Sequence, residues 1–122
     1  MNRPALVETI RVLRTIPNDM FDMGVYFRQT TCGTVACIAG HCAMDPWFEA
    51  QGFSAGLFSL APTFNLKAGI DAIRAFYDLT DDQVHHIFYA PLLTPQAAIE
   101  RINTFLFFDG IPTPADLRGD TL

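Results

Sequence analysis

The sequence predicts an all-α fold, with one compact domain over residues 1–122 that holds about five helices around a central helix of small residues. Apolar residues recur at spacings of three and four in several segments, as on the buried face of a helix. These segments begin or end at capping residues, glycines or prolines. Half of the residues are apolar and eleven are phenylalanine, which is enough side-chain area to build a large core.

The first helix is expected to begin at Asn2 or Arg3, with Pro4 in its first turn, where proline is well tolerated. It should end at Pro17, because proline disfavours helical geometry at the residue before it. Its apolar face is formed by Leu6, Ile10 and Leu13. Residues 18–33 lack a helical period and are expected to form an irregular loop.

The central helix is expected from Thr34 to Met44, within a segment that carries all three cysteines. Thr34 is a suitable N-cap, because its hydroxyl can accept a free backbone N–H. Residues 35–40 are all small or β-branched. We therefore expect a neighbouring helix to approach closely at Ala36 and Gly40, which lie one turn apart.

The chain after the central helix is expected to contain one long irregular loop and then an amphipathic helix. Residues 45–65 are rich in glycine and proline, which leaves room only for a helical turn near residues 46–51. Residues 66–79 show the helical period, with an apolar stripe made of Leu66, Ile70, Ile73 and Tyr77.

Two further helices have clear start signals. Thr80 and Gln83 have the spacing of a capping box, in which each side chain bonds to the backbone of the other residue. Thr94 and Pro95 start the last long helix in a similar way, and Gly110 is placed to be its C-terminal cap. We expect these two helices to complete the core.

Composition excludes several classes of function. The formal charge is −5, and only one lysine and seven scattered arginines are present, so no basic patch suggests nucleic-acid binding. No apolar run reaches the roughly 18 residues of a membrane span. The N-terminal sequence does not resemble a signal peptide, and an odd number of cysteines is typical of free thiols in the cytoplasm. No cofactor is indicated, and the sequence does not identify a small-molecule ligand.

Cys32 is the candidate reactive thiol, because it lies just before the expected helix start, where free N–H groups lower a thiol's pKa. His85 or His86 could serve as its base, although adjacent helical residues point about 100° apart, so at most one can face the core. Cysteine hydrolases of this type usually place their histidine on a following sheet, and no such strand is evident. No residue is therefore assigned as catalytic.

A metal site is the other candidate chemistry in this segment. Cys37 and His41 are one helical turn apart, and Cys32 could approach from the preceding loop to give a thiolate–imidazole set that suits zinc. The paired Cys-x-x-Cys spacing of structural zinc sites is absent. The alternative is that Cys37 is a small core residue, as free cysteines often are.

The end of the last helix is a candidate interface. Phe105, Phe107 and Phe108 lie within four residues, and Phe107 points about 100° away from Phe108. A helix that is apolar on more than one side usually contacts a second partner, so we expect a homodimer. The alternative is that the tail after residue 110 covers these rings.

The chain resembles a family of small bacterial and phage proteins that have no established activity. The resemblance rests on FDM at 21–23, CGTVACIAGHCAM at 32–44, LTDDQVHHIFYA at 79–90 and TPQAAIERINTFL at 94–106. It implies a bacterial or phage source and a shared helical fold, and it carries no catalytic residue. The sequence favours a binding, regulatory or self-associating module. The alternative is a thiol-dependent enzyme or a metal-binding protein centred on Cys32, Cys37 and His41.

Overall fold

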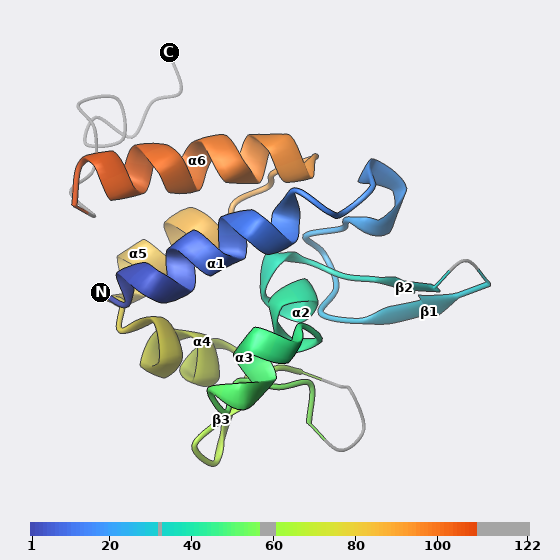
Figure 1. Ribbon diagram of the computed structural model, residues 1–122, viewed down its shortest axis with the longest axis horizontal. Coiled ribbons are helices and arrows are strands. Elements are labelled where there is room, and N and C mark those ends of the chain that lie inside the picture. The colour runs from blue at the N-terminus through green and yellow to red at the C-terminus, as the bar shows by residue number, and fades with distance from the viewer. Residues whose placement is uncertain (32, 57–60, 110–122) are drawn as a thin grey trace.

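The computed structural model describes residues 1–31, 33–56 and 61–109, and within them the fold is mixed rather than all-α. Six α-helices of the described residues are accompanied by two antiparallel two-stranded sheets (Figure 1). The prediction of an all-α domain is therefore wrong. In chain order the elements are α1 (Arg3–Leu13), the 3-10 helix η1 (Asn18–Met20), β1 (Arg28–Thr30), β2 (Gly33–Val35), α2 (Ile38–Ala43), α3 (Pro46–Ala50), β3 (Thr63–Phe64), β4 (Lys67–Ala68), α4 (Ile70–Tyr77), α5 (Asp81–Phe88) and α6 (Pro95–Phe107).

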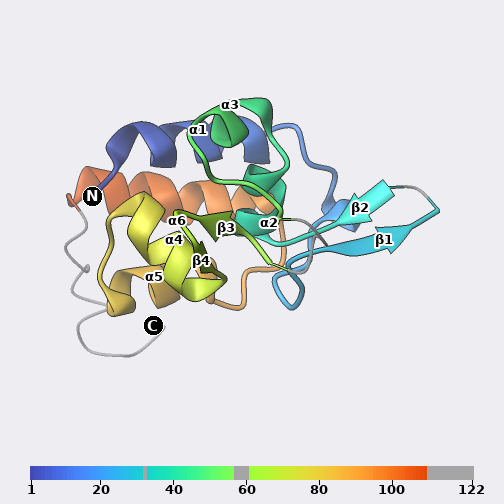
Figure 2. The same cartoon turned by 90° about the horizontal axis from the view of Figure 1, so that it is seen from below.

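The first and last helices lie side by side and run in opposite directions (Figures 1 and 2). The side chain of Asn2 caps α1 by accepting a hydrogen bond from Ala5 N, which confirms the predicted start. Arg3 then ties the beginning of α1 to the end of α6, with its Nη1 2.7 Å from Asp109 Oδ1. None of the described helices has both the length and the apolar character needed to cross a bilayer.

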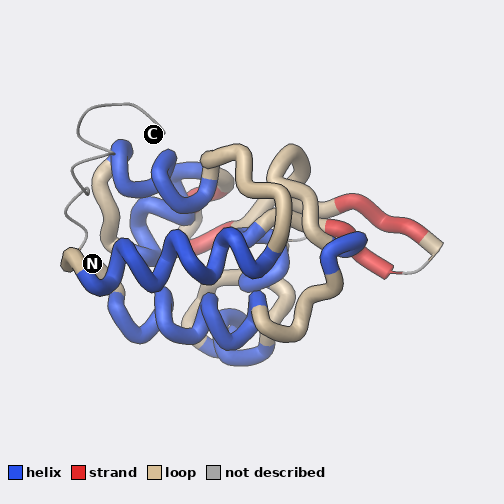
Figure 3. Tube along the Cα trace, turned by 90° about the horizontal axis from the view of Figure 1, so that it is seen from above, coloured by secondary structure: helices blue, strands red, loops and turns tan. Residues whose placement is uncertain are grey.

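The central helix is much shorter than predicted. Helix α2 begins at Ile38 with Cys37 as its N-cap, so the prediction of a helix from Thr34 is wrong. Thr34 instead lies in β2, where it pairs with Gln29 of β1. The β1–β2 hairpin projects away from the helices (Figure 3). The prediction that α2 is central and buried is nevertheless confirmed, since all six of its residues are buried.

Residues 35–37 are extended because their backbone groups bond to residues 18–33, the segment that was expected to form an irregular loop. Ala36 N donates to Met20 O at 3.2 Å, and Ala36 O accepts from Asp22 N at 3.0 Å. Cys37 N donates to Val25 O at 3.0 Å. These bonds compete with a helix at the same residues, because each N–H can serve only one of the two structures. A buried backbone without such partners would cost free energy.

The second hairpin explains why α4 starts later than the periodicity predicts. Thr63 pairs with Ala68 and Phe64 with Lys67, so the chain turns back at residues 65 and 66. Leu66 has a φ of 68° and is fully exposed, and its predicted place on the buried stripe of α4 is wrong. Ile73 and Tyr77 of that stripe are confirmed, because both are completely buried, while Ile70 is partly buried.

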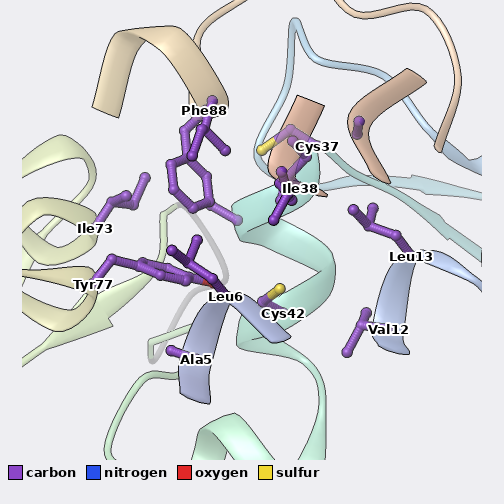
Figure 4. Packing of buried hydrophobic residues seen from close by; sticks show 14 of the residues in the cluster. Ala5, Leu6, Val12, Leu13, Cys37, Ile38, Cys42, Ile73, Tyr77 and Phe88 are labelled. Atoms are coloured by element: carbon purple, nitrogen blue, oxygen red, sulfur yellow. The ribbon is translucent and has the colours of Figure 1, made fainter. Parts of the chain in front are cut away.

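The core lies between the helices and contains one cluster of stacked rings. Phe53 stacks on Phe76 at a centroid distance of 4.7 Å, and both rings pack around Phe48. Tyr77 adds a polar group to this core, since its hydroxyl lies 2.8 Å from the hydroxyl of Thr9 on α1. Figure 4 shows the Tyr77 ring beside Leu6 and Cys42, at the opposite end of α2 from Cys37.

The last two helices begin as predicted. The Thr80–Gln83 capping box is present in full at α5, and the side chain of Thr94 accepts from Ala97 N at the start of α6. The short helical turn expected near residues 46–51 is α3, which is capped by Asp45. The predicted C-terminal cap at Gly110 lies outside the described residues.

Candidate functional site

Two features of the described residues stand out as candidate sites. One is a cavity beside Cys37, and the other is the aromatic end of α6 with the groove next to it. Each contains residues that the sequence singled out.

The Cys37 cavity has a volume of about 220 Å³ and lies where three separate segments meet. Helix α2 contributes its N-cap, the end of α5 contributes two aromatic rings, and the loop before β1 forms the remaining wall. The residues that line it are Met23, Gly24, Val25, Tyr26, Cys37, Phe88 and Tyr89. All of these side chains are uncharged at neutral pH, so the cavity wall is mainly apolar with a few polar atoms.

The Cys37 thiol is not activated in this position. Burial raises its pKa, although the nearby N–H groups of Gly40 and Ala39 act in the opposite direction. The side chain is 3% exposed. Burial likewise raises the pKa of the Cys42 thiol to about 12, and this side chain is fully enclosed. Both thiols are therefore protonated near neutral pH, which makes them poor nucleophiles and poor metal ligands.

The helix dipole that was expected to activate Cys32 begins at Cys37 instead, five residues later in the chain. Cys32 itself lies outside the described residues, so the prediction that it is a reactive thiol stays a prediction. Its sequence neighbours Thr31 and Gly33 belong to the β1–β2 hairpin region rather than to a helix start.

His41 is held as a structural residue. Its Nε2 lies 2.6 Å from the carbonyl oxygen of Met20, and because a carbonyl can only accept, this nitrogen carries the proton. Burial lowers the pKa of His41, while the bond to Met20 acts to raise it. Within residues 1–31, 33–56 and 61–109, no group of three or more Cys, His, Asp or Glu could hold a metal ion. The predicted set of Cys32, Cys37 and His41 includes a residue outside those ranges and stays untested.

The two histidines considered as bases both lie on α5, and the ring of His85 contacts Tyr89 at a centroid distance of 5.4 Å. His85 Nδ1 lies 2.8 Å from the carbonyl oxygen of Asp81, one turn earlier on the same helix. His86 is packed against α6, where Arg101 Nη1 donates to its carbonyl oxygen at 3.0 Å. Neither histidine lines the Cys37 cavity. Neither of these two histidines is therefore placed as a general base for Cys37.

Sequence reasoning missed a pair of tyrosines at the cavity. The hydroxyls of Tyr26 and Tyr89 form a hydrogen bond, although the two residues are 63 positions apart in the chain. Burial raises the pKa of Tyr89 well above its ordinary value, and the bond to Tyr26 raises it further. The Tyr89 hydroxyl is therefore protonated at any physiological pH. No short-range signal in the sequence could have paired these residues.

The three phenylalanines at the end of α6 have different environments. Phe105 is part of the core and is 5% exposed. Phe107 is 81% exposed and Phe108 is 40% exposed, and their rings make an edge-to-face contact at 5.0 Å. The predicted second apolar side of this helix is therefore present among the described residues.

A groove between α1 and α6 lies next to this exposed aromatic pair. It has a volume of about 400 Å³, and Val7, Ile10 and Leu106 form its apolar part. Val7 is itself 56% exposed. Asn103 also lines the groove, and Phe107 follows it by one helical turn, so the ring stands beside the groove on the same side of α6. The groove and Phe107 together are called the α1–α6 face below.

Charged side chains of α1 also line the groove of the α1–α6 face. Arg11 is engaged by two acids, Glu8 on its own helix and Asp45 at 2.8 Å. Arg14 also lines the groove. Within the described ranges, no ion pair forms at Arg14. The groove therefore combines apolar and charged side chains, as protein interfaces commonly do.

The chain matches no protein-family model, and comparison with curated proteins and with solved structures finds no match either.

Proposed function

We propose that this protein is a self-associating binding module that forms a homodimer through the α1–α6 face. The observation that carries the proposal is the 81% exposure of Phe107 beside a groove whose apolar part is formed by Val7, Ile10 and Leu106. A large ring held in water next to a partly apolar groove is unfavourable in an isolated chain. It becomes favourable when a second surface covers both.

A second copy of the chain suits this face because the face is self-complementary. In a two-fold symmetric dimer, residue i of one copy meets residue j of the other, and residue j meets residue i. A protruding Phe107 and a neighbouring groove on one face meet this requirement, because each ring can enter the groove of the opposite copy. Val7 and Leu106 would then contact the incoming ring.

The energy available from this contact is considerable. Burying a fully exposed phenylalanine contributes about 1.5–3 kcal/mol. Two-fold symmetry doubles this to roughly 3–6 kcal/mol per dimer, which corresponds to about 10² to 10⁴ in the dissociation constant. Phe107 is thus placed to act as the central anchor of the interface, in the way that aromatic residues commonly do.

Sedimentation velocity over a range of micromolar concentrations tests the proposal. The wild type is expected to sediment as a dimer, and Phe107→Asp as a monomer with unchanged circular dichroism. Leu93→Asp is the matched control, because Leu93 is also exposed, at 85%, but precedes α6 and does not line the groove. A wild type that stays monomeric at high micromolar concentration, or a Leu93→Asp variant that dissociates equally, contradicts the proposal.

The described thiols support a cytoplasmic setting for this module. Cys37 and Cys42 are both free and buried, as structural cysteines of a reducing compartment usually are. The alternative of a thiol-dependent enzyme receives no support from these two residues, since burial raises the pKa of each.

A further inference from the structure

The Cys37 cavity is a second site, separate from the α1–α6 face. We infer that it binds a small, neutral, mainly apolar molecule that carries one hydrogen-bond acceptor. The inference rests on the lining of the cavity, on the hydrogen bond between its two tyrosines and on its size.

The lining selects against charged ligands. None of the seven residues around the cavity carries a charge at neutral pH, and most of the wall is aliphatic, aromatic or thioether. A carboxylate or an ammonium group placed there would lose its hydration without gaining an ion pair, which is strongly unfavourable. A neutral ligand has no such cost, and the Phe88 ring and the Met23 side chain offer it dispersion contacts.

The tyrosine pair supplies one hydrogen-bond donor. In the bond between Tyr26 and Tyr89, one hydroxyl donates the hydrogen bond and the other accepts it. The second hydroxyl keeps a proton that the pair does not use. No other protein acceptor for either hydroxyl is found within the described ranges, and both residues line the cavity. A ligand with one carbonyl or ether oxygen can accept that proton.

The size of the cavity sets the scale of the ligand. A volume of about 220 Å³ is below the range typical of drug-sized sites and suits a single ring. Cys37 contributes a buried, uncharged thiol to the lining, and Tyr89 contributes a partly exposed ring. The site therefore fits a molecule of about seven to ten non-hydrogen atoms.

Cyclohexanone is a suitable probe, because it is neutral, apolar and has one carbonyl oxygen. Binding can be followed by NMR on protein with labelled methionine methyl groups, where Met23 lines the cavity and Met44 does not. Cyclohexanone is expected to shift the Met23 methyl signal saturably, with a dissociation constant on the order of millimolar, and to leave Met44 unchanged. Cyclohexanecarboxylate, of similar size but charged, is expected to bind at least tenfold more weakly.

Two sets of variants test separately whether the ligand occupies the cavity and whether a tyrosine hydroxyl donates to it. Val25→Trp fills the cavity and should abolish the Met23 shift in a protein whose other methyl signals show that it is folded. The double variant Tyr26→Phe/Tyr89→Phe removes both hydroxyls and should weaken cyclohexanone binding about three- to tenfold. Tyr89→Phe alone is its control, since the remaining Tyr26 hydroxyl still has a proton to donate.

Three results would overturn the inference. The first is the absence of a saturable Met23 shift in the wild type. The second is equal binding of the ketone and the carboxylate. The third is a Val25→Trp protein that is folded and binds as the wild type does. An unchanged affinity in the double tyrosine variant would overturn the assignment of the donor.

Discussion

Replacing Gly40 by alanine would test the contact on which the central part of the fold depends. Gly40 lies in α2, directly against the backbone of Tyr26 in the loop before β1. A Cβ atom at this position would lie 2.0 Å from the carbonyl oxygen of Tyr26 and 2.8 Å from the Cβ of Ala36. The close approach predicted at Ala36 and Gly40 is thus present, but the neighbour is a loop backbone and not a helix.

The size of the effect follows from these distances. To reach an ordinary contact, the loop and α2 would have to separate by more than an ångström, which strains the 3.0 Å bond between Cys37 N and Val25 O. Overpacking of this kind costs about 1–3 kcal/mol, and a lost hydrogen bond adds about 1 kcal/mol. Alanine regains about 0.5–1 kcal/mol through its better helix propensity. We expect a net destabilisation of roughly 1–3.5 kcal/mol, or about 4–14 °C in melting temperature.

Urea unfolding followed by circular dichroism measures this difference. Gly24→Ala is the matched control in the same loop, because its nearest atom would be the side-chain oxygen of Asp22 at 3.1 Å. That variant is expected to lose less than about 1 kcal/mol. If Gly40→Ala were as stable as the wild type, or more stable, the loop could not pack on α2 as described, and the wall of the Cys37 cavity would be misplaced.

Three further predictions concern pH, thiols and salt. Burial keeps the pKa of His41 in the folded protein below its ordinary 6.5, so the unfolded chain binds a proton at higher pH than the folded chain does. The stability that is present above pH 6.5 is therefore lost as the pH falls through the folded-state pKa. His41→Gln should flatten the dependence of the unfolding free energy on pH between pH 7 and about 5. In native protein, iodoacetamide should label Cys37 and Cys42 at least tenfold more slowly than Cys32, as read by mass spectrometry, and equal rates for all three would contradict this. Because each copy carries a formal charge of −5, raising the salt concentration should tighten the dimer severalfold by screening repulsion, and a looser dimer at high salt would argue for an interface dominated by ion pairs.

The starts of α1, α5 and α6 could be predicted because their signals are local. Asn2, Thr80 and Thr94 each cap a helix with a side chain that bonds within three residues, so the pattern is complete in a short stretch of sequence. The buried faces of α4 and α6 could also be predicted from local sequence. Ile73 and Ile102 lie on the apolar stripes that the helical periodicity predicts, and both side chains are buried.

The two hairpins could not be predicted from the same signals. The small residues before α2 suit a buried helix by composition. Residues 33–35 are extended because they pair with β1, and residues 36 and 37 because they bond to Met20, Asp22 and Val25. Leu66 looks like a stripe residue, yet it occupies a left-handed turn position that sequence patterns associate with glycine or asparagine. Tertiary partners override local preference in both places.

The candidate sites divide in the same way. The exposed end of α6 could be predicted, because Phe107 lies off the buried stripe by helical geometry alone. The Cys37 cavity could not, because its walls come from residues 23–26, 37 and 88–89, and only the fold brings them together. The prediction that Cys32 is a reactive thiol depended on a helix that starts near Thr34. Helix α2 instead starts at Ile38, with Cys37 as its N-cap.

The most direct test of the dimer is an isotope-filtered NOE measurement on a one-to-one mixture of labelled and unlabelled protein, which detects contacts between copies only. We predict NOEs from the Phe107 ring of one copy to the methyl groups of Val7 and Leu106 of the other. A sample that sediments as a dimer but gives none of these NOEs, while showing contacts from another surface, would contradict the assignment of the α1–α6 face.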